Sequence, residues 1–176
     1  MNKQPNSHNC FICGVKNVAG VQVAFYEVSA ADGTSEVLAR FRGRAVHQGY
    51  PGRMHGGVAA GILDEVMSRC IAYGDEALAP PAWGVTVEMT VRYHAPVPLE
   101  VDLTARGRLT RDRSRVADAT AELYLPDGTV AVSATGKFMK LPLDQIADES
   151  ASDALGWQVY ADAAPMSPDA ESPDTD

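Results

Sequence analysis

One amphipathic helix set among strand-like segments is the feature that most constrains the fold of this chain of 176 residues. Residues 57–72 contain no proline, and at about 100° per residue their apolar side chains fall on one continuous arc. The arc consists of Ala59, Ala60, Leu63, Val66, Met67, Cys70 and Ile71. Glu65 and Arg69 lie on the opposite side, four residues apart, and are expected to form a solvent-exposed ion pair. Such a helix must bury its apolar arc against another layer.

Six segments with the character of β-strands flank the helix, two before it and four after it. They are residues 21–29, 36–42, 83–93, 101–109, 116–125 and 129–141. Asp127-Gly128 predicts a tight hairpin between the last two segments, and consecutive hairpins imply an antiparallel sheet. The sequence therefore predicts an α+β fold, with a curled antiparallel sheet of about five or six strands wrapped around one long helix. This architecture is called a hotdog.

Composition indicates one ordinary soluble domain. Hydrophobic residues make up 45% and charged residues 22% of the chain, both close to the average for soluble proteins. No window approaches the roughly 18 apolar residues of a membrane span, and the N-terminus lacks the apolar run of a secretory signal. Three cysteines are too few for a disulfide framework, so a cytoplasmic, reducing setting is expected.

The net charge of −8 is concentrated at the C-terminal end of the chain. Residues 144–176 carry nine acidic residues and no Lys or Arg, which leaves 14 acids and 15 bases in residues 1–143. A nearly neutral body lacks the basic surface that general nucleic-acid binding requires. We therefore expect an N-terminal Cys-x-x-Cys-Gly segment (1–20), a hotdog domain (21–143) and an acidic, disordered tail (144–176). Leu155–Tyr160 is the one cluster in this tail able to dock on the body.

The segment that leads into the helix carries the residues best suited to chemistry. Gly56 and Gly57 leave backbone N–H groups unobstructed at the helix start, where the helix dipole favours a negative charge or a polarised carbonyl. Asp64 lies two turns further on, at the edge of the buried face, where a carboxylate suits the work of a base or nucleophile. The same residues also fit a tight turn and a purely structural hydrogen bond.

Three motifs in the same order resemble those of a known family. His55-Gly56-Gly57, followed by Asp64 nine residues after the histidine, resembles the signature of hotdog-fold acyl-CoA thioesterases of the PaaI-like and 4-hydroxybenzoyl-CoA branches. Gly84–Pro96 resembles the family's Gly-Val-Ser/Thr…Tyr…Pro strand. Cys10–Gly14 resembles the Cys-x-x-Cys-Gly opening of some members, and the whole resemblance covers residues 10–141.

This resemblance implies hydrolysis of acyl-CoA to the free acid and coenzyme A, without a metal or an organic cofactor. Asp64 would be the general base or nucleophile, and the Gly57 N–H would polarise the thioester carbonyl. His55 would orient the loop or contact the thioester. Thr86 would come from the facing subunit of a homodimer, or of a dimer of dimers, and would place the attacking water. Substrate contacts are expected from Gln48, Gly56, Ala60, Met67, Arg111 and Arg113.

Several of these assignments have alternatives. Gln48 stands where many members carry an Asn or Gln, six or seven residues before the histidine, so it is a substitute at most. Arg111 and Arg113 flank a predicted hairpin, where guanidinium groups suit the phosphates of coenzyme A or simply point to solvent. Cys10 and Cys13 form one half of a zinc motif, but no second Cys-x-x-Cys follows, so no metal is expected.

Two further functions fit the same architecture. The first is a non-catalytic acyl-CoA-binding protein, in which the acidic tail is an interaction element. The second is a hotdog hydratase or dehydratase, in which His55 and Asp64 act as the acid and base pair. The Gly-Gly pair directly after His55 fits the thioesterase loop better than it fits the hydratase.

Overall fold

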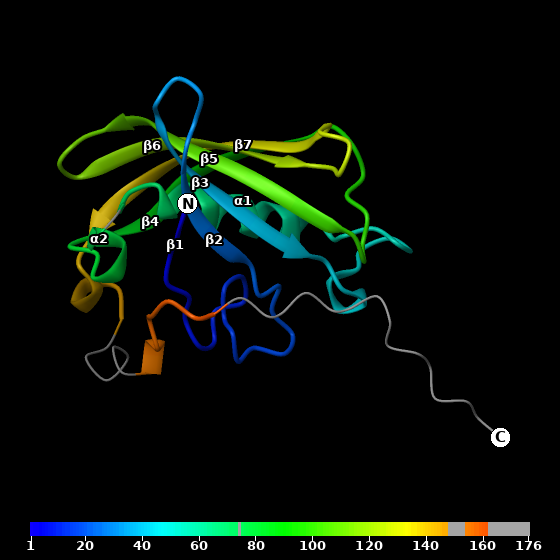
Figure 1. The fold of residues 1–176 in the computed structure, drawn as a ribbon, viewed down its shortest axis with the longest axis horizontal. Helices are drawn as coiled ribbons and strands as arrows, with labels where there is room; N and C mark the ends of the chain where they lie inside the picture. Colours follow the sequence, from blue (N-terminus) through cyan, green and yellow to red (C-terminus); the bar gives the residue numbers. More distant parts are fainter. Residues whose placement is uncertain (74, 148–153, 162–176) are drawn as a thin grey trace.

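A curled antiparallel sheet holds one long helix against its inner face, as Figure 1 shows for the computed structural model of the chain. The structure describes residues 1–73, 75–147 and 154–161. The strands form one sheet of seven in the order β1-β2-β3-β5-β6-β7-β4, and every neighbouring pair is antiparallel. The predicted hotdog architecture is therefore confirmed.

Six of the seven strands correspond to the segments that the sequence predicts. The strands are β1 (Asn2–Lys3), β2 (Ala24–Ser29), β3 (Ser35–Arg42), β4 (Trp83–Tyr93), β5 (Asp102–Asp112), β6 (Val116–Tyr124) and β7 (Val130–Leu141). The additional strand, β1, pairs with β2 and has only two residues, so it is too short to show an alternating pattern.

The long helix α1 spans Gly56–Arg69 and is slightly shorter than the predicted range of 57–72. Shorter helical elements in the described residues include η1 (Ala45–His47), α2 (Asp75–Leu78) and η2 (Leu143–Gln145). None of the helices in the described ranges has the length and hydropathy needed to span a bilayer.

Small side chains in the middle of the sheet allow α1 to come close to it. The buried face of α1 includes Leu63, Val66 and Met67, as the apolar arc predicts. The strands β5, β6 and β7 present buried small residues at Ala105, Ala119, Ala121 and Ala134. At Gly107 on β5, an added Cβ atom would lie only 2.6 Å from Val66 Cγ1, so this position has no room for a side chain.

The second face of α1 is covered as well, and the expectation of a solvent-exposed Glu65–Arg69 pair is wrong. Their side chains are only 17% and 5% exposed, respectively, and their charged atoms lie 2.7 Å apart. Arg69 also donates to the Pro5 carbonyl oxygen at 2.7 Å and stacks on the Phe25 ring, 3.8 Å from its centroid. The helical pattern could not show this, because the cover is the N-terminal segment, which is remote in sequence.

Part of the C-terminal region docks on the body. Trp157 donates from Nε1 to the Ala77 carbonyl oxygen at 3.0 Å and makes an edge-on contact with Trp83, with ring centroids 4.7 Å apart. Gln158 bridges to Asn6 in the N-terminal segment. The docking expected for Leu155–Tyr160 is therefore confirmed. Of the tail expected to be disordered (144–176), residues 148–153 and 162–176 lie outside the described residues.

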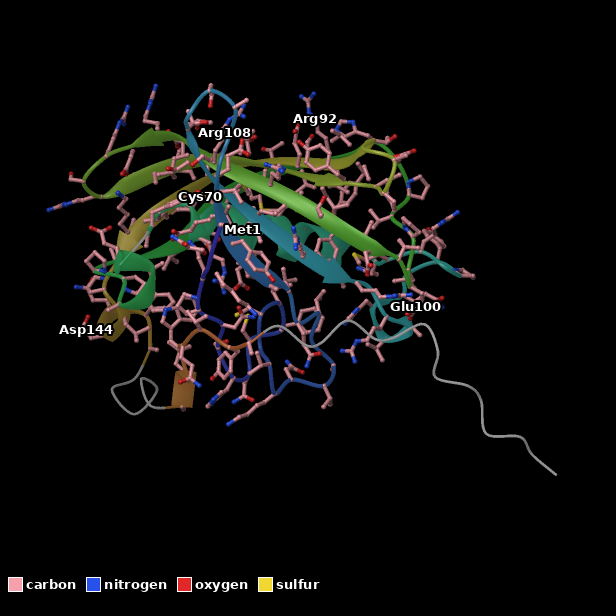
Figure 2. The ribbon with its side chains drawn as sticks, in the orientation of Figure 1. Met1, Cys70, Arg92, Glu100, Arg108 and Asp144 are labelled. Carbon is pink, nitrogen blue, oxygen red and sulfur yellow. The ribbon has the colours of Figure 1, made fainter. Side chains whose placement is uncertain are left out.

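The outer face of the sheet carries charged side chains and contributes nothing to the helix interface. Arg92 and Arg108 project from this face, on the side away from α1 (Figure 2). Arg106 and Arg108 share the carboxylate of Glu36, with N–O distances of 3.1 and 3.5 Å. The two faces of the sheet therefore have separate roles, packing on one side and solvation on the other.

Substitution of Gly107 tests whether close contact between α1 and the sheet holds the fold together. We expect Gly107→Val to lower the free energy of unfolding by about 1–3 kcal/mol, because the new side chain overlaps Val66. Thr110→Val, at an exposed position on the same strand, is the matched control and should be nearly neutral. Chemical denaturation of both variants measures the difference, and equal stabilities would contradict the packing argument.

Candidate functional site

At the candidate site, a hydrogen bond joins β4 to α1, since Thr86 Oγ1 donates to Asp64 Oδ1 at 2.6 Å. A β-bulge between Thr86 and Glu88 interrupts the alternation of β4, and bulges are known to re-aim side chains. Gly84 allows the helix to approach this strand, because an added Cβ atom there would lie 3.2 Å from Cβ of Ser68 on α1. Backbone geometry therefore fixes the Asp64–Thr86 pair.

Both members of this pair belong to one chain. The expectation that Thr86 serves the Asp64 of a facing subunit stays a prediction, whereas within one chain Thr86 already donates to Asp64. The physical reason is the sheet order, since β4 follows β7 at the end of the sheet and α1 packs across it. A partner subunit is therefore not needed to form the pair.

The surroundings of Asp64 make it a better base than an ordinary aspartate. The Asp64 carboxyl is half-buried, and this burial raises its pKa because removal from water disfavours the charged form. The hydrogen bond from Thr86 lowers the pKa, and the negative charge of Glu65 raises it, with a net upward shift. Asp64 thus has a proton affinity above the usual range and one hydroxyl donor that orients it.

The start of α1 is capped by a histidine ring. His55 is the N-cap residue, and its Nδ1 atom accepts a hydrogen bond from the Gly57 N–H at 3.0 Å. The Gly57 N–H is therefore already paired and can polarise a carbonyl only when the ring of His55 turns away. Gly56 is held from the other side, since the Tyr93 hydroxyl donates to its carbonyl oxygen at 2.9 Å.

A cavity of about 460 Å³ adjoins the start and middle of α1. Asp64 and Gly57 line it together, so the structure brings the predicted carboxylate and the predicted backbone donor to one space. The apolar part of its wall comes from four separate segments of the chain. These wall residues are Phe11, Ile12, Ile71, Trp83, Leu155 and Trp157.

The predicted substrate contacts on and before α1 lie outside this cavity. Met67 is fully buried in the core and has no surface to offer a ligand, and Ala60 is half-buried on α1. The exposed Gln48 closes its own loop, since its side-chain oxygen accepts from the Gly52 N–H at 2.9 Å. Gly56 lines a different depression, beside Tyr93.

The predicted phosphate-binding arginines also lie away from the cavity. Arg111 is near Asp118 on the neighbouring strand, with an Nε–Oδ2 distance of 3.9 Å, and its side chain is 59% exposed. Arg113 is exposed in the turn that joins β5 to β6. Between this end of β5 and the strand that carries Thr86 lie β6 and β7.

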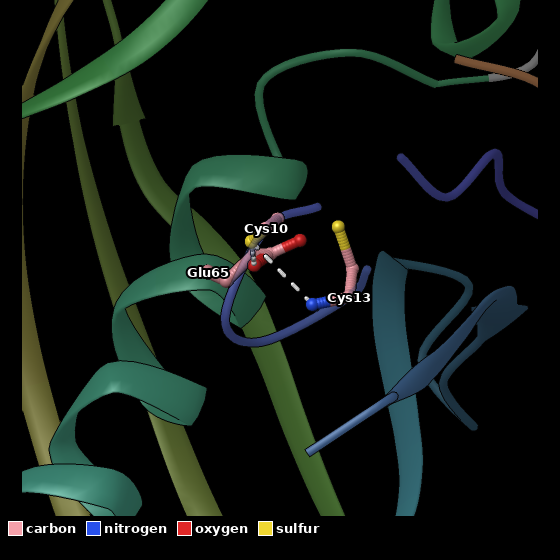
Figure 3. Close-up of side chains that lie close together, drawn as sticks. All are labelled: Cys10, Cys13 and Glu65. Atoms are coloured by element: carbon pink, nitrogen blue, oxygen red, sulfur yellow. Dashed lines mark hydrogen bonds between the residues drawn. The ribbon is translucent and has the colours of Figure 1, made fainter. Parts of the chain in front are cut away.

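The N-terminal segment and α1 together supply site residues that the sequence did not assign. Cys10, Cys13 and Glu65 all line the cavity, and one ligand atom from each lies within 4.8 Å of the others. Figure 3 shows the two sulfur atoms and the carboxylate gathered between the N-terminal loop and α1. The Cys-x-x-Cys spacing was the only signal for this cluster, because Glu65 is 52 residues away from Cys13 in the sequence.

The Asp64–Thr86 pair can be tested by titration of the carboxyl group. We expect the pKa of Asp64 to lie above that of an ordinary aspartate and to rise further in Thr86→Val, because this change removes the hydrogen bond that favours the charged form. Carbon NMR of the labelled side chain, assigned with Asp64→Asn, measures the shift. Thr90→Val on the same strand should leave the pKa unchanged, and an unchanged or lower pKa in Thr86→Val would rule out the pairing.

Comparisons with known proteins agree with the hotdog fold. The profile of a family described as the thioesterase superfamily matches residues 51–132. A solved structure of a thioesterase superfamily protein is 32% identical over 75% of this chain, with a TM-score of 0.62, and the match spans 60% of that protein's length. The comparison with curated proteins gave no match.

Two more distant structures share the fold. A thioesterase from Haemophilus influenzae is 14% identical, with 74% of this chain and 86% of that chain covered and a TM-score of 0.61. A protein from Streptococcus mutans, solved with bound acetyl CoA, is 17% identical, with 67% and 89% covered and a TM-score of 0.55. At these identities the likeness supports the architecture alone.

Proposed function

We propose that this chain, whose residues 51–132 match the thioesterase superfamily, is an enzyme that hydrolyses acyl-CoA thioesters to a free acid and coenzyme A. The observation that carries this proposal is the position of Asp64. Its carboxylate is fixed by Thr86, has a raised pKa, and faces the same cavity as the first turn of α1. A base, a carbonyl-binding helix start and a cavity for the substrate are the parts that thioester hydrolysis requires.

In the proposed reaction, Asp64 acts on a water molecule next to the thioester carbonyl. The carboxylate takes a proton from the water as its oxygen attacks the carbonyl carbon, and the Gly57 N–H stabilises the resulting oxyanion once the ring of His55 has turned away. The carbon–sulfur bond then breaks, and the proton passes from Asp64 to the coenzyme A sulfur. In an alternative route, the Asp64 carboxylate itself attacks the carbonyl carbon and expels the coenzyme A thiolate. Water then hydrolyses the resulting anhydride between Asp64 and the acyl group.

Thr86 is a positioning residue in this scheme. Its hydroxyl donates to Asp64 Oδ1, which leaves Oδ2 for the water. The hydrogen bond also favours the charged form of the carboxyl and thereby limits the rise of its pKa. Thr86 thus favours the charged form of the Asp64 carboxyl, whereas burial raises its proton affinity.

The acyl group would occupy the apolar side of the cavity. Phe11, Ile71 and Trp157 offer apolar walls, and a volume of about 460 Å³ has room for an aryl or medium-chain acyl group. A protein of this fold from Streptococcus mutans was solved with bound acetyl CoA, and we propose a coenzyme A ligand for the present cavity as well. Arg111 and Arg113 remain the proposed phosphate contacts of a coenzyme A moiety that extends beyond the cavity.

Replacement of the carboxylate tests the central assignment. We expect Asp64→Asn to lower kcat by about 10²–10⁴-fold without unfolding the protein, because the amide cannot accept the proton from water. A screen of aryl- and alkyl-CoA esters, with release of the free thiol as the readout, measures this. Asp102→Asn is the matched control, since that side chain is 92% exposed and far less constrained. Full activity in Asp64→Asn would remove Asp64 from the reaction.

The docked tryptophan should affect substrate binding more than chemistry. Trp157→Ala removes one apolar wall, and we expect KM for the preferred acyl-CoA to rise about threefold to tenfold with a smaller change in kcat. Val159→Ala, in the same segment but 47% exposed, should leave both constants unchanged. A fall in kcat with KM unchanged would place Trp157 outside the acyl subsite.

The two other candidate functions have distinct outcomes in the same assays. A hydratase would add water to an enoyl-CoA, but the ring nitrogen Nδ1 of His55 is bonded to Gly57 N–H, which does not favour a His55–Asp64 acid and base pair. A non-catalytic protein would bind acyl-CoA across the panel without release of thiol. The paired and partly buried Asp64 favours turnover over binding alone.

We also propose that the protein forms a homodimer through β4. This strand comes last in the sheet order, and Val87 and Tyr93 on it are 57% and 55% exposed. Pairing of two such edges would satisfy the open backbone groups and bury these side chains. Light scattering should give at least twice the monomer mass, and a monomer at micromolar concentration would contradict the proposal.

A further inference from the structure

We propose that Cys10, Cys13 and Glu65 form a binding site for one thiophilic divalent ion, Zn²⁺, in the wall of the cavity that contains Asp64. The proposal concerns the N-terminal segment and is independent of thioester hydrolysis. The sequence predicts no metal, because it shows one Cys-x-x-Cys pair and no second pair to complete four ligands. The fold instead brings a carboxylate from α1 to the two sulfurs (Figure 3).

In the loop from Cys10 to Gly14, backbone N–H groups orient the Cys10 sulfur in a way that suits binding of a cation. The N–H groups of Ile12 and Cys13 both point at Cys10 Sγ, at 3.3 and 3.5 Å. Backbone donors aimed at a sulfur stabilise a thiolate, which is the form that binds metals. Gly14 closes this turn through a hydrogen bond to the Cys10 carbonyl oxygen at 2.9 Å.

Only glycine fits at the end of this turn. A Cβ atom on Gly14 would lie 2.3 Å from the Cys10 carbonyl oxygen and 2.7 Å from its nitrogen. The tight turn keeps the two cysteines on the same side of the loop. The Cys-x-x-Cys-Gly motif therefore encodes a pair of converging sulfur atoms rather than two unrelated buried thiols.

Glu65 is held in the orientation of a ligand by Arg69. Its Oε1 atom accepts from Arg69 Nε at 2.9 Å and from Nη2 at 2.7 Å, while Oε2 lies 3.3 Å from Cys10 Sγ. One carboxylate oxygen is thus committed to a buried guanidinium and the other faces the sulfurs. Such an outer partner is what fixes ligating carboxylates in metal sites.

The charges of the cluster suit a divalent ion. Two thiolates and one carboxylate carry three negative charges and Arg69 carries one positive charge, which leaves two for the ion to neutralise. In a tetrahedral zinc site with bonds of about 2.0–2.3 Å, neighbouring ligand atoms lie roughly 3–4 Å apart. Ligand atoms that already lie within 4.8 Å of one another need only small movements to reach this geometry.

The fourth coordination position would face the cavity. Cys10, Cys13 and Glu65 line the same space as Asp64, so a water molecule or a sulfur-bearing ligand from the cavity can complete the tetrahedron. Zinc sites that exchange a ligand typically have three protein ligands and one open coordination position. Cys70, the third cysteine, is buried elsewhere and bonds to the Val66 carbonyl oxygen, so it has no part in this site.

Metal analysis of the full-length protein tests the site directly. The protein is reduced, stripped with a chelator under anaerobic conditions, and then titrated with Zn²⁺ or Co²⁺. We expect one ion per chain, a higher melting temperature in the presence of Zn²⁺, and thiolate-to-cobalt charge-transfer absorption with Co²⁺. Absence of charge transfer, or no stoichiometric binding, would overturn the proposal without any bearing on the thioesterase assay.

Variants identify the ligands and separate this site from a dithiol pair that merely forms a disulfide. Cys10→Ser and Cys13→Ser should lose stoichiometric binding, and Glu65→Gln should weaken Zn²⁺ binding by tenfold or more. Cys70→Ala is the matched control and should bind like the unmodified protein, and circular dichroism shows that each variant is folded. Retention of full affinity in Cys10→Ser or Cys13→Ser, or formation of a Cys10–Cys13 disulfide that Zn²⁺ fails to prevent, would contradict the assignment.

Discussion

Close contact between α1 and the strands beneath it is the constraint on which the rest of the structure depends. Gly107 in the centre of the sheet and Gly84 at its edge both lie where a side chain would collide with the helix or a residue on it. This contact buries Leu63, Val66 and Met67 and places the next residue around the helix, Asp64, against β4. The candidate site is therefore a consequence of core packing rather than of a flexible loop.

The local pattern predicts much of this fold. The apolar arc of α1 and the alternation in β2 to β7 depend on neighbours within a few residues, so a single sequence displays them. The motif from His55 to Asp64 likewise lies on one helix and its N-cap, and the structure places Asp64 and Gly57 on one cavity. These features could be predicted because their geometry is set by the helix itself.

The features that could not be predicted all involve long-range contacts. The β-bulge that turns Thr86 toward Asp64, the cover over Glu65 and Arg69, and the docking of Trp157 bring together segments far apart in the sequence. Charged residues on the outer arc of an isolated helix normally face water, so the pattern of α1 gave the wrong environment for Glu65 and Arg69. Arg69 is instead the point at which the N-terminal segment, the sheet and the C-terminal segment meet.

The N-terminal segment places a second cluster of polar and sulfur-containing side chains next to the Asp64–Thr86 pair. It closes one wall of the cavity and brings two sulfurs within a few ångströms of Glu65, the residue next to Asp64. The proposed hydrolysis depends on the thioester carbonyl lying between Asp64 and the first turn of α1. A crystal structure of Asp64→Asn with an intact acyl-CoA tests this most directly. The account predicts the carbonyl oxygen within hydrogen-bond distance of the Gly57 N–H, with the acyl group near Trp157; a thioester bound in the depression beside Gly56 and Tyr93 would contradict it.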